Sequence, residues 1–285
     1  MIIKLIRKQL KKRFPHVYKK SYKLRSYLFK VLSKKQNINL VSEFFEHSPG
    51  GSGRADLISN NILYNIKNIS SSLNLLIKEP KKIKKFNELS YDSDLATKLM
   101  TLFEKNGSDK HLHNYHLIYS YIFSNYKVES LLEIGLGSND ENILSSMGDY
   151  GVPGGCLRTF SEILDDNAKI VGLDVDESIL FNEKNIQTFY LDQLNLEDIN
   201  KFSNQYNRYF DLLIDDGLHS NISMINTIHL AQTILRENGI LVIEDIFHEQ
   251  LNYLNIALNL CRESFDYEIY SMDKTYVIIA NLKNR

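Results

Sequence analysis

Short apolar runs alternate with segments of helical length throughout the sequence after Asp92, and this alternation constrains the fold more than any other feature. Strands that alternate with helices form βαβ units, which build a parallel sheet covered by helices. Two later runs, Tyr267–Ser271 and Thr275–Ala280, lie close together and predict a terminal hairpin. The five earlier runs are Ser130–Ile134, Lys169–Asp174, Ile186–Leu191, Phe210–Asp215 and Ile240–Glu244. Residues 91–285 are therefore predicted to form an α/β domain with a seven-stranded, Rossmann-like sheet.

The first 90 residues differ in character from the rest of the chain. No Asp or Glu precedes Glu43, whereas Lys and Arg recur throughout that stretch. Apolar and basic side chains are interleaved up to a break near Pro15, as in a basic amphipathic helix. Such a helix can lie on an anionic membrane, dock on a partner or pack on its own domain, and the pattern leaves these open. We expect residues 1–90 to form a basic, mainly helical accessory region with a flexible break at Ser48–Gly53.

The composition argues against several classes of protein. The two cysteines, Cys156 and Cys261, supply neither a disulfide framework nor a cysteine-rich metal site. No apolar run reaches the ~20 residues of a membrane-spanning helix, and the N-terminus lacks the features of a signal peptide. Residues 91–285 carry no basic and aromatic stripe for nucleic acid. We expect a cytoplasmic protein without a nucleic-acid partner. The sequence leaves open both a peripheral contact of residues 1–35 with the cytoplasmic face of an anionic membrane and self-association.

A pair of glycines follows the first predicted strand. Gly135 and Gly137 allow a tight turn and a close approach of the backbone to a ligand. Glu133, near the end of that strand, is placed to bind an ammonium group directly or through water. A dinucleotide-binding Gly-x-Gly-x-x-Gly loop would continue with a third glycine, but Asp140 stands there and would repel a pyrophosphate. The pattern therefore favours S-adenosylmethionine, a nucleoside cofactor without phosphate, over a nicotinamide dinucleotide.

Polar residues also follow the second and third predicted strands. Ligands of open α/β sheets bind beyond the carboxyl ends of the strands, so these residues are candidates for the same site. Asp174 is placed to accept hydrogen bonds from ribose hydroxyls, an arrangement that nicotinamide enzymes share. Asp192 and Gln193 suit the adenine edge or the ribose. Each residue alone is also typical of turns and helix caps, but their recurrence at successive strand ends indicates a nucleoside site.

Carboxylates and a histidine converge at the ends of the fourth and fifth predicted strands. The fourth strand runs into Asp215, Asp216 and His219, and the fifth runs into Glu244 and Asp245. Ionised carboxylates are suitable ligands for Mg²⁺, Mn²⁺ or Ca²⁺. We assign Asp215 to the cofactor site and interpret the other four as a candidate metal and catalytic site.

An alkyl hydroxyl needs activation before it can accept a methyl group, because its pKa lies far above 7. His219 is the best placed general base, and Asp216 beside it is the second candidate catalytic residue. The rival cluster is formed by His111, His113 and His116. Activity of a His219 variant would decide between the two.

The motifs resemble a known family in their order and approximate spacing. They are Gly107–Lys110, His113–Tyr115, Leu132–Gly137, Gly154–Arg158, Gly172–Asp174, Asp192–Gln193, Asp215–His219 and Ile243–Asp245. Between about Leu95 and Ile246 the chain is similar to the metal-dependent sugar O-methyltransferases of the macrolide type and to their cephalosporin-hydroxylase-like and rhamnosyl methyltransferase relatives. The resemblance implies a class I methyltransferase fold, S-adenosylmethionine as cofactor, and a divalent ion, usually Mg²⁺.

The resemblance also implies roles for particular residues. It implies that Asp216, Glu244 and Asp245 hold the ion and that His219 deprotonates a sugar hydroxyl. The implied cofactor contacts are Glu133, Gly135, Asp174, Asp192, Gln193 and the segments around Ser108–Asp109 and Leu157–Arg158. The sequence departs from the family pattern at Leu218 and Cys156, which replace serines, and in the insert Asp140–Val152. Leu218 leaves the identity of the acceptor open.

The expected function is methylation of a sugar hydroxyl in a surface glycan or a glycosylated metabolite, with a small molecule or glycan as acceptor. A sugar-linked phosphoramidate or another small metabolite is an alternative acceptor. A nicotinamide-dependent oxidoreductase and a non-catalytic module that binds S-adenosylmethionine are the alternatives from other classes. Thermal protection by adenosylhomocysteine or by a dinucleotide would distinguish the cofactors.

Overall fold

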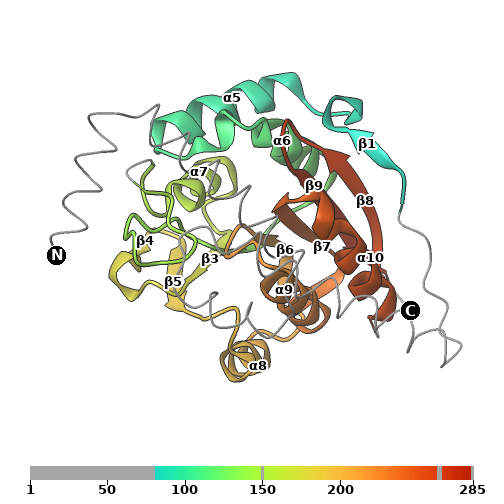
Figure 1. Ribbon diagram of the computed structural model, residues 1–285. Coiled ribbons are helices and arrows are strands. Elements are labelled where there is room, and N and C mark those ends of the chain that lie inside the picture. The colour runs from blue at the N-terminus through green and yellow to red at the C-terminus, as the bar shows by residue number, and fades with distance from the viewer. Residues whose placement is uncertain (1–80, 149–150, 262–264, 284–285) are drawn as a thin grey trace, which may run out of the picture. The chain divides into compact units, whose positions relative to one another are not determined.

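The structure is a computed structural model that describes residues 81–148, 151–261 and 265–283 (Figure 1). The predicted basic helix within residues 1–35, the predicted break at Ser48–Gly53 and the rest of the accessory region up to residue 80 lie outside the described residues. In the described part of the chain, no helix is long and apolar enough to cross a membrane.

The described residues form a nine-stranded sheet with the order β1-β8-β9-β7-β6-β2-β3-β5-β4. The strands are β1 (Ile83–Lys85), β2 (Ser130–Ile134), β3 (Lys169–Asp174), β4 (Asn182–Glu183), β5 (Ile186–Tyr190), β6 (Phe210–Asp215), β7 (Leu235–Ile246), β8 (Phe265–Ser271) and β9 (Tyr276–Leu282). Strands β5, β3, β2, β6 and β7 run parallel. Strand β9 is inserted between β7 and β8 and is antiparallel to both. Five parallel strands followed by this hairpin are the arrangement of a class I methyltransferase sheet, so the predicted fold class is confirmed.

Most predicted strands agree closely with the observed ones. Strands β2, β3 and β6 match the prediction residue for residue, and β5 ends one residue earlier. Strand β7 is longer than expected, because Leu235 already pairs with Phe210 before a register shift. Sequence patterns missed β1 and β4, which are too short for an alternation to be visible. Strand β1 pairs in parallel with β8, so the sheet includes residues of the predicted accessory region.

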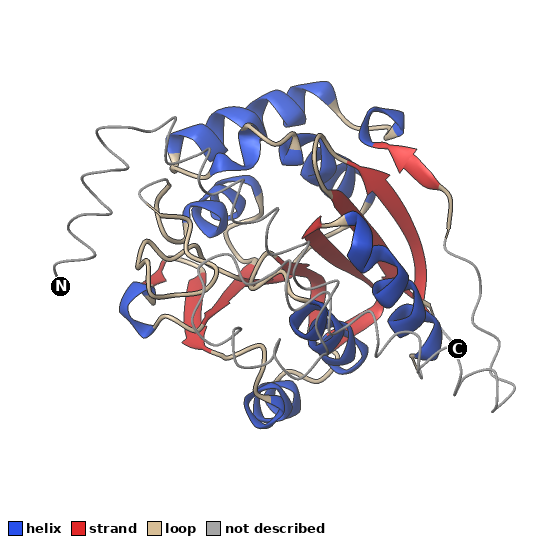
Figure 2. Cartoon of the chain, viewed as in Figure 1, coloured by secondary structure: helices blue, strands red, loops and turns tan. Residues whose placement is uncertain are grey.

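Helices cover both faces of the sheet (Figure 2). They are α5 (Ser93–Lys105), α6 (Tyr115–Asn125), α7 (Gly155–Ile163), α8 (Leu196–Gln205), α9 (Asn221–Ile234) and α10 (Leu251–Leu260). Alternate residues of each central strand enter two different cores: Leu131 packs with α5, α6 and α7, whereas Leu132 packs with α8, α9 and α10. Strands buried on both faces explain the almost continuous apolar runs in the sequence.

Close contacts between loops define the carboxyl edge of the sheet. Gly135 has a φ of 95°, and a Cβ atom at this position would lie 2.1 Å from the backbone oxygen of Asp216. Only glycine fits both the backbone conformation and this contact. The loop after β2 therefore lies directly against the loop after β6, where the predicted catalytic residues begin.

Candidate active site at the carboxyl ends of the strands

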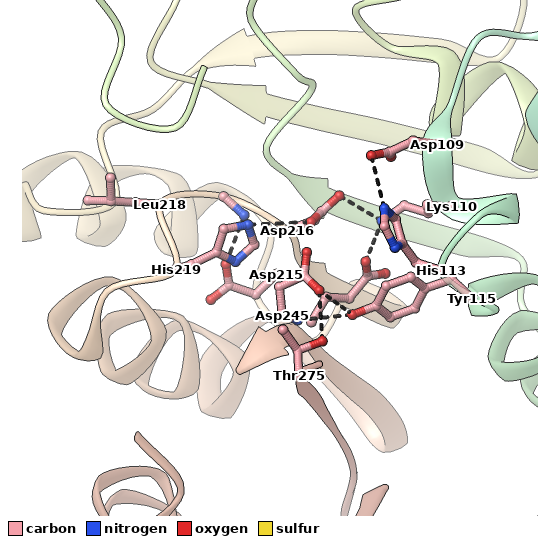
Figure 3. Close-up of polar contacts among 12 residues, drawn as sticks. Asp109, Lys110, His113, Tyr115, Asp215, Asp216, Leu218, His219, Asp245 and Thr275 are labelled. Carbon is pink, nitrogen blue, oxygen red and sulfur yellow. Dashed lines mark hydrogen bonds and ion pairs between the residues drawn. The ribbon is translucent and has the colours of Figure 1, made fainter. Parts of the chain in front are cut away.

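Three predicted site residues meet at the ends of β6 and β7 (Figure 3). Asp216, His219 and Asp245 each offer one ligand atom, and these atoms lie within 4.8 Å of one another. Nε2 of His219 is 3.6 Å from Oδ1 of Asp216, and both side chains are about one quarter exposed. A partly open group of two carboxylates and an imidazole has donor atoms that suit a divalent cation.

Asp245 is held in place by two hydroxyl groups from other elements. Its Oδ1 accepts a hydrogen bond of 2.9 Å from the Tyr115 hydroxyl on α6 and one of 3.1 Å from Thr275 in the β8–β9 turn. The Asp245 amide donates to the Tyr115 oxygen at 3.0 Å. These bonds fix the carboxylate although Asp245 has a left-handed φ of 49°, a conformation that side chains other than glycine adopt at some cost.

His219 also has a left-handed backbone, with a φ of 53°. Its carbonyl oxygen accepts a hydrogen bond of 2.8 Å from Gln250. Its Nδ1 atom is buried and has no hydrogen-bond partner among the described residues. The ring therefore presents Nε2 to Asp216, and this atom is available for proton transfer or for ligation.

Lys110 lies next to this group of residues, and its ammonium contacts two predicted metal ligands. The side chain is almost fully buried, and its ammonium donates to Oδ2 of Asp216 at 2.6 Å and to Oε2 of Glu244 at 2.5 Å. Burial lowers the pKa of Lys110, but the carboxylates of Asp216 and Glu244 outweigh it and raise that pKa well above its ordinary value. The ammonium is therefore charged at any physiological pH.

Glu244 is fully buried and is engaged at both oxygens. Oε2 accepts from Lys110, and Oε1 accepts from the Tyr119 hydroxyl on α6. Glu244 does not belong to the group of ligand atoms within 4.8 Å, although it directly precedes Asp245.

Glu133, at the end of β2, is a buried carboxylate with weak contacts to the protein. Neither of its oxygens makes a hydrogen bond of normal geometry among the described residues, and its polar neighbours are the Lys110 ammonium, 3.9 Å from Oε1, and the Cys156 thiol. Burial raises the pKa of Glu133 to about 7, although Lys110 acts in the opposite direction. A buried acceptor pair of this kind fits a ligand that brings its own ammonium group.

Asp174 holds the glycine loop against β3. Its Oδ2 accepts from the Leu136 amide at 2.7 Å, and its Oδ1 accepts from the Asp176 amide at 2.9 Å. Asp176 in turn accepts from the Ser138 hydroxyl. Each carboxylate oxygen keeps a second lone pair, so Asp174 can still accept from a ribose hydroxyl.

The other predicted cofactor residues make bonds within the protein. Gln193 donates to Asp215 at 2.9 Å and to Thr227 at 3.1 Å, and it accepts from the Leu218 amide at 2.9 Å. Asp192 accepts from the Leu194 amide in a turn. The structure thus brings Asp192, Gln193 and Asp215 to the same edge, where Gln193 braces the loop that carries His219.

The motifs before β2 and on α7 have structural contacts of their own. Arg158 forms a paired contact with Glu183, with both distances 2.9 Å, and its neighbour Leu157 is fully buried in the core. Ser108 caps the short helix Asp109–His111. Asp109 is exposed and lies 3.6 Å from His113.

The rival histidine cluster is not part of the group around Asp216. His111 contacts the carbonyl oxygen of Ser108 at 2.8 Å. His116 is half-buried, and burial lowers its pKa. Among the described residues, His219 is the histidine that lies beside the candidate metal ligands.

Sequence reasoning missed four residues that support the site. Lys110 and Tyr115 stand inside motifs that were recognised, so a signal was present although no role followed from it. Tyr119 and Thr275 contact Glu244 and Asp245 from elements distant in the sequence, and no pattern marks them.

Two curated proteins are similar to part of the chain, and no family model matches it. The chain is 30% identical over 127 residues to demethylmacrocin O-methyltransferase of Streptomyces fradiae and 29% identical over 127 residues to mycinamicin VI 2''-O-methyltransferase of Micromonospora griseorubida. These matches cover 44% of this chain but 30% and 29% of those proteins, so the chain spans under a third of the length of these relatives.

Solved methyltransferase structures are also similar to the chain. A methyltransferase of the mycinamycin biosynthetic pathway, in complex with Mg and SAH, gives a TM-score of 0.44 at 29% identity, over 52% of this chain and 37% of that one. A methyltransferase from Geobacter sulfurreducens gives 0.38 at 11% identity, over 79% of this chain and 90% of that one. By its strand order the chain has the fold of a class I S-adenosylmethionine-dependent methyltransferase, and over part of its sequence it resembles the macrolide-sugar O-methyltransferases.

Proposed function

We propose that the protein transfers the methyl group of S-adenosylmethionine to a sugar hydroxyl in a glycan precursor or a glycosylated metabolite. The observation that carries this proposal is the juxtaposition of His219 with Asp216 and Asp245 beside the glycine loop of a methyltransferase sheet. Both curated relatives are named as O-methyltransferases, and one of them as acting at a 2''-O position. Their names support an oxygen acceptor for this chain.

Glu133 supports the proposed cofactor site most directly. Its buried carboxylate makes no hydrogen bond of normal geometry within the described residues, so it can accept from the ammonium group of the methionine part of the cofactor. Gly135 and Gly137 let the backbone approach that part, and Asp174 accepts from the ribose. The remaining proposed contacts are Asp192, Gln193, Asp215 and the backbone around Ser108–Asp109 and Leu157–Arg158.

The acidic residues Asp216, Glu244 and Asp245 form the proposed metal site, with Mg²⁺ as the expected ion. Their oxygen atoms are the donors that this ion prefers, and Asp216 and Asp245 are partly open to solvent. A bound divalent ion would supply Lewis-acid activation of the acceptor hydroxyl. His219 would take the hydroxyl proton at Nε2 as the oxygen attacks the methyl carbon, and the bond from this carbon to sulfur breaks.

Replacing His219 tests the proposed general base. His219→Ala should lower turnover by about 10²–10⁴ because proton removal loses its acceptor, while adenosylhomocysteine still binds. Activity is measured by mass spectrometry with nucleotide sugars and surface-glycan fragments as acceptors.

Removal of the metal tests the proposed ion. EDTA should suppress turnover, and added Mg²⁺ or Mn²⁺ should restore it.

His229→Ala is the matched control, because His229 is an exposed histidine on α9 outside the site. Full turnover of His219→Ala would move the base to the cluster of His111, His113 and His116. Full turnover in buffer freed of metal would remove the ion from the reaction. Thermal protection by a nicotinamide dinucleotide in place of adenosylhomocysteine would overturn the proposed cofactor.

A further inference from the structure

We propose that Lys110 is a positioning residue in the acidic site. Its ammonium fills the buried side of the site, between Asp216 and Glu244, so Glu244 influences a bound ion only through Lys110. A divalent ion then binds Asp216 and Asp245 on the outer side, which is partly open to solvent. The inference rests on the proposed metal-dependent function and refines its ligand set. It concerns a lysine to which neither the fold nor the motifs assign a role.

The contacts of Lys110 divide the oxygen atoms of the site. Its ammonium lies 2.6 Å from Oδ2 of Asp216 and 2.5 Å from Oε2 of Glu244, so both contacts are charge-assisted hydrogen bonds. The rings of Tyr115 and Tyr119 lie 5.1 and 6.0 Å from the same nitrogen. The buried ammonium is therefore enclosed by groups that favour a cation.

Glu244 and Asp216 differ in what remains available to an ion. Glu244 is fully buried and gives one oxygen to Lys110 and the other to Tyr119. Asp216 gives Oδ2 to Lys110, whereas its Oδ1 faces His219 and joins the group that includes Asp245. The ion pair with Lys110 thus orients Asp216, whereas Asp245 is held by Tyr115 and Thr275.

Charge balance gives the lysine a second effect. Three carboxylates, those of Glu133, Asp216 and Glu244, lie within 4 Å of the ammonium. Without Lys110 two neighbouring carboxylates would lose their counter-ion and would attract additional cation. The lysine should therefore restrict the site to a single divalent ion.

The test measures Mn²⁺ affinity and stoichiometry by calorimetry on the full chain. The wild type should bind one Mn²⁺, and Asp245→Asn should weaken binding more than about 100-fold, beyond the range for residues that only support ligands. Glu244→Gln should weaken binding by about 10–100-fold, the range for residues that support a ligand from behind. Lys110→Met should bind Mn²⁺ about tenfold more tightly or take a second ion, because an opposing charge is gone.

The double variant Lys110→Met/Glu244→Gln separates positioning from ligation. The double variant has the same net charge as the wild type, so its Mn²⁺ affinity should return toward the wild-type value. If Glu244 were a ligand, the Mn²⁺ affinity of the double variant would stay low. This variant also avoids leaving Glu244 buried without a partner, so it keeps the test valid if Lys110→Met does not fold. Lys105→Met is the matched control, because Lys105 is an exposed lysine paired with Glu162 at 2.7 Å.

Two outcomes would overturn the inference while the proposed function stands. One is a loss in Glu244→Gln equal to that in Asp245→Asn, and the other is unchanged Mn²⁺ affinity and stoichiometry in Lys110→Met. Failure of the wild type to bind Mn²⁺ would instead remove the proposed metal site, and the inference would fall with it.

Discussion

Glu133 makes the stability of the cofactor-free protein depend on pH. Burial raises its pKa from the ordinary value of 4.5 to about 7, which corresponds to about 3 kcal/mol. A carboxyl group with a raised pKa in the folded state contributes stability below pH 4.5 and loses it as the pH rises through about 7. Urea unfolding at pH 5 to 8 should therefore show the wild type losing stability relative to Glu133→Gln. Parallel pH profiles of the two proteins would contradict a raised pKa of the buried Glu133 carboxyl group.

The β8–β9 hairpin has a function in the site beyond completing the sheet. Thr275 in its turn donates to Asp245 at 3.1 Å, so Thr275→Val should free that carboxylate and lower Mn²⁺ affinity by about tenfold. The volume of the side chain is kept, and adenosylhomocysteine affinity should not change. Thr101→Val on the exposed face of α5 is the control, because Thr101 bonds only its own helix. Equal Mn²⁺ affinity in Thr275→Val and the wild type would show that Tyr115 alone orients Asp245.

The agreement between predicted and observed elements depended on burial. Strands β2, β3 and β6 are buried on both faces, so their apolar runs have clear limits in the sequence. Strand β1 depends on contacts with β8, including ion pairs of Lys81 with Asp266 and of Lys84 with Glu268. A three-residue strand that is stabilised by such distant contacts leaves no periodic signal.

The acid-free N-terminal segment predicts that the whole molecule associates with anionic membranes. Each basic residue near an anionic surface contributes about 1 kcal/mol of attraction. Full-length protein should therefore co-sediment with liposomes that contain phosphatidylserine at low salt, and deletion of residues 1–35 should abolish this binding while activity on soluble acceptors remains. Liposomes of neutral lipid are the control. If the full-length protein stays in solution with anionic liposomes, the segment instead serves packing or self-association.

The sequence by itself determined the fold class, the ends of the buried strands β2, β3 and β6, and the edge of the sheet at which the candidate site lies. In a parallel sheet all carboxyl ends meet at one edge, so residues such as Glu133, Asp174, Asp216 and Asp245 were bound to converge once their strands were recognised. Only the tertiary structure decided which of them touch. Lys110 and Glu244 are 134 positions apart, and their pairing depends on how the short helix Asp109–His111 is placed against the end of β7. Short-range patterns record the period and the ends of each element, but not the packing that places the buried Lys110 ammonium among three carboxylates.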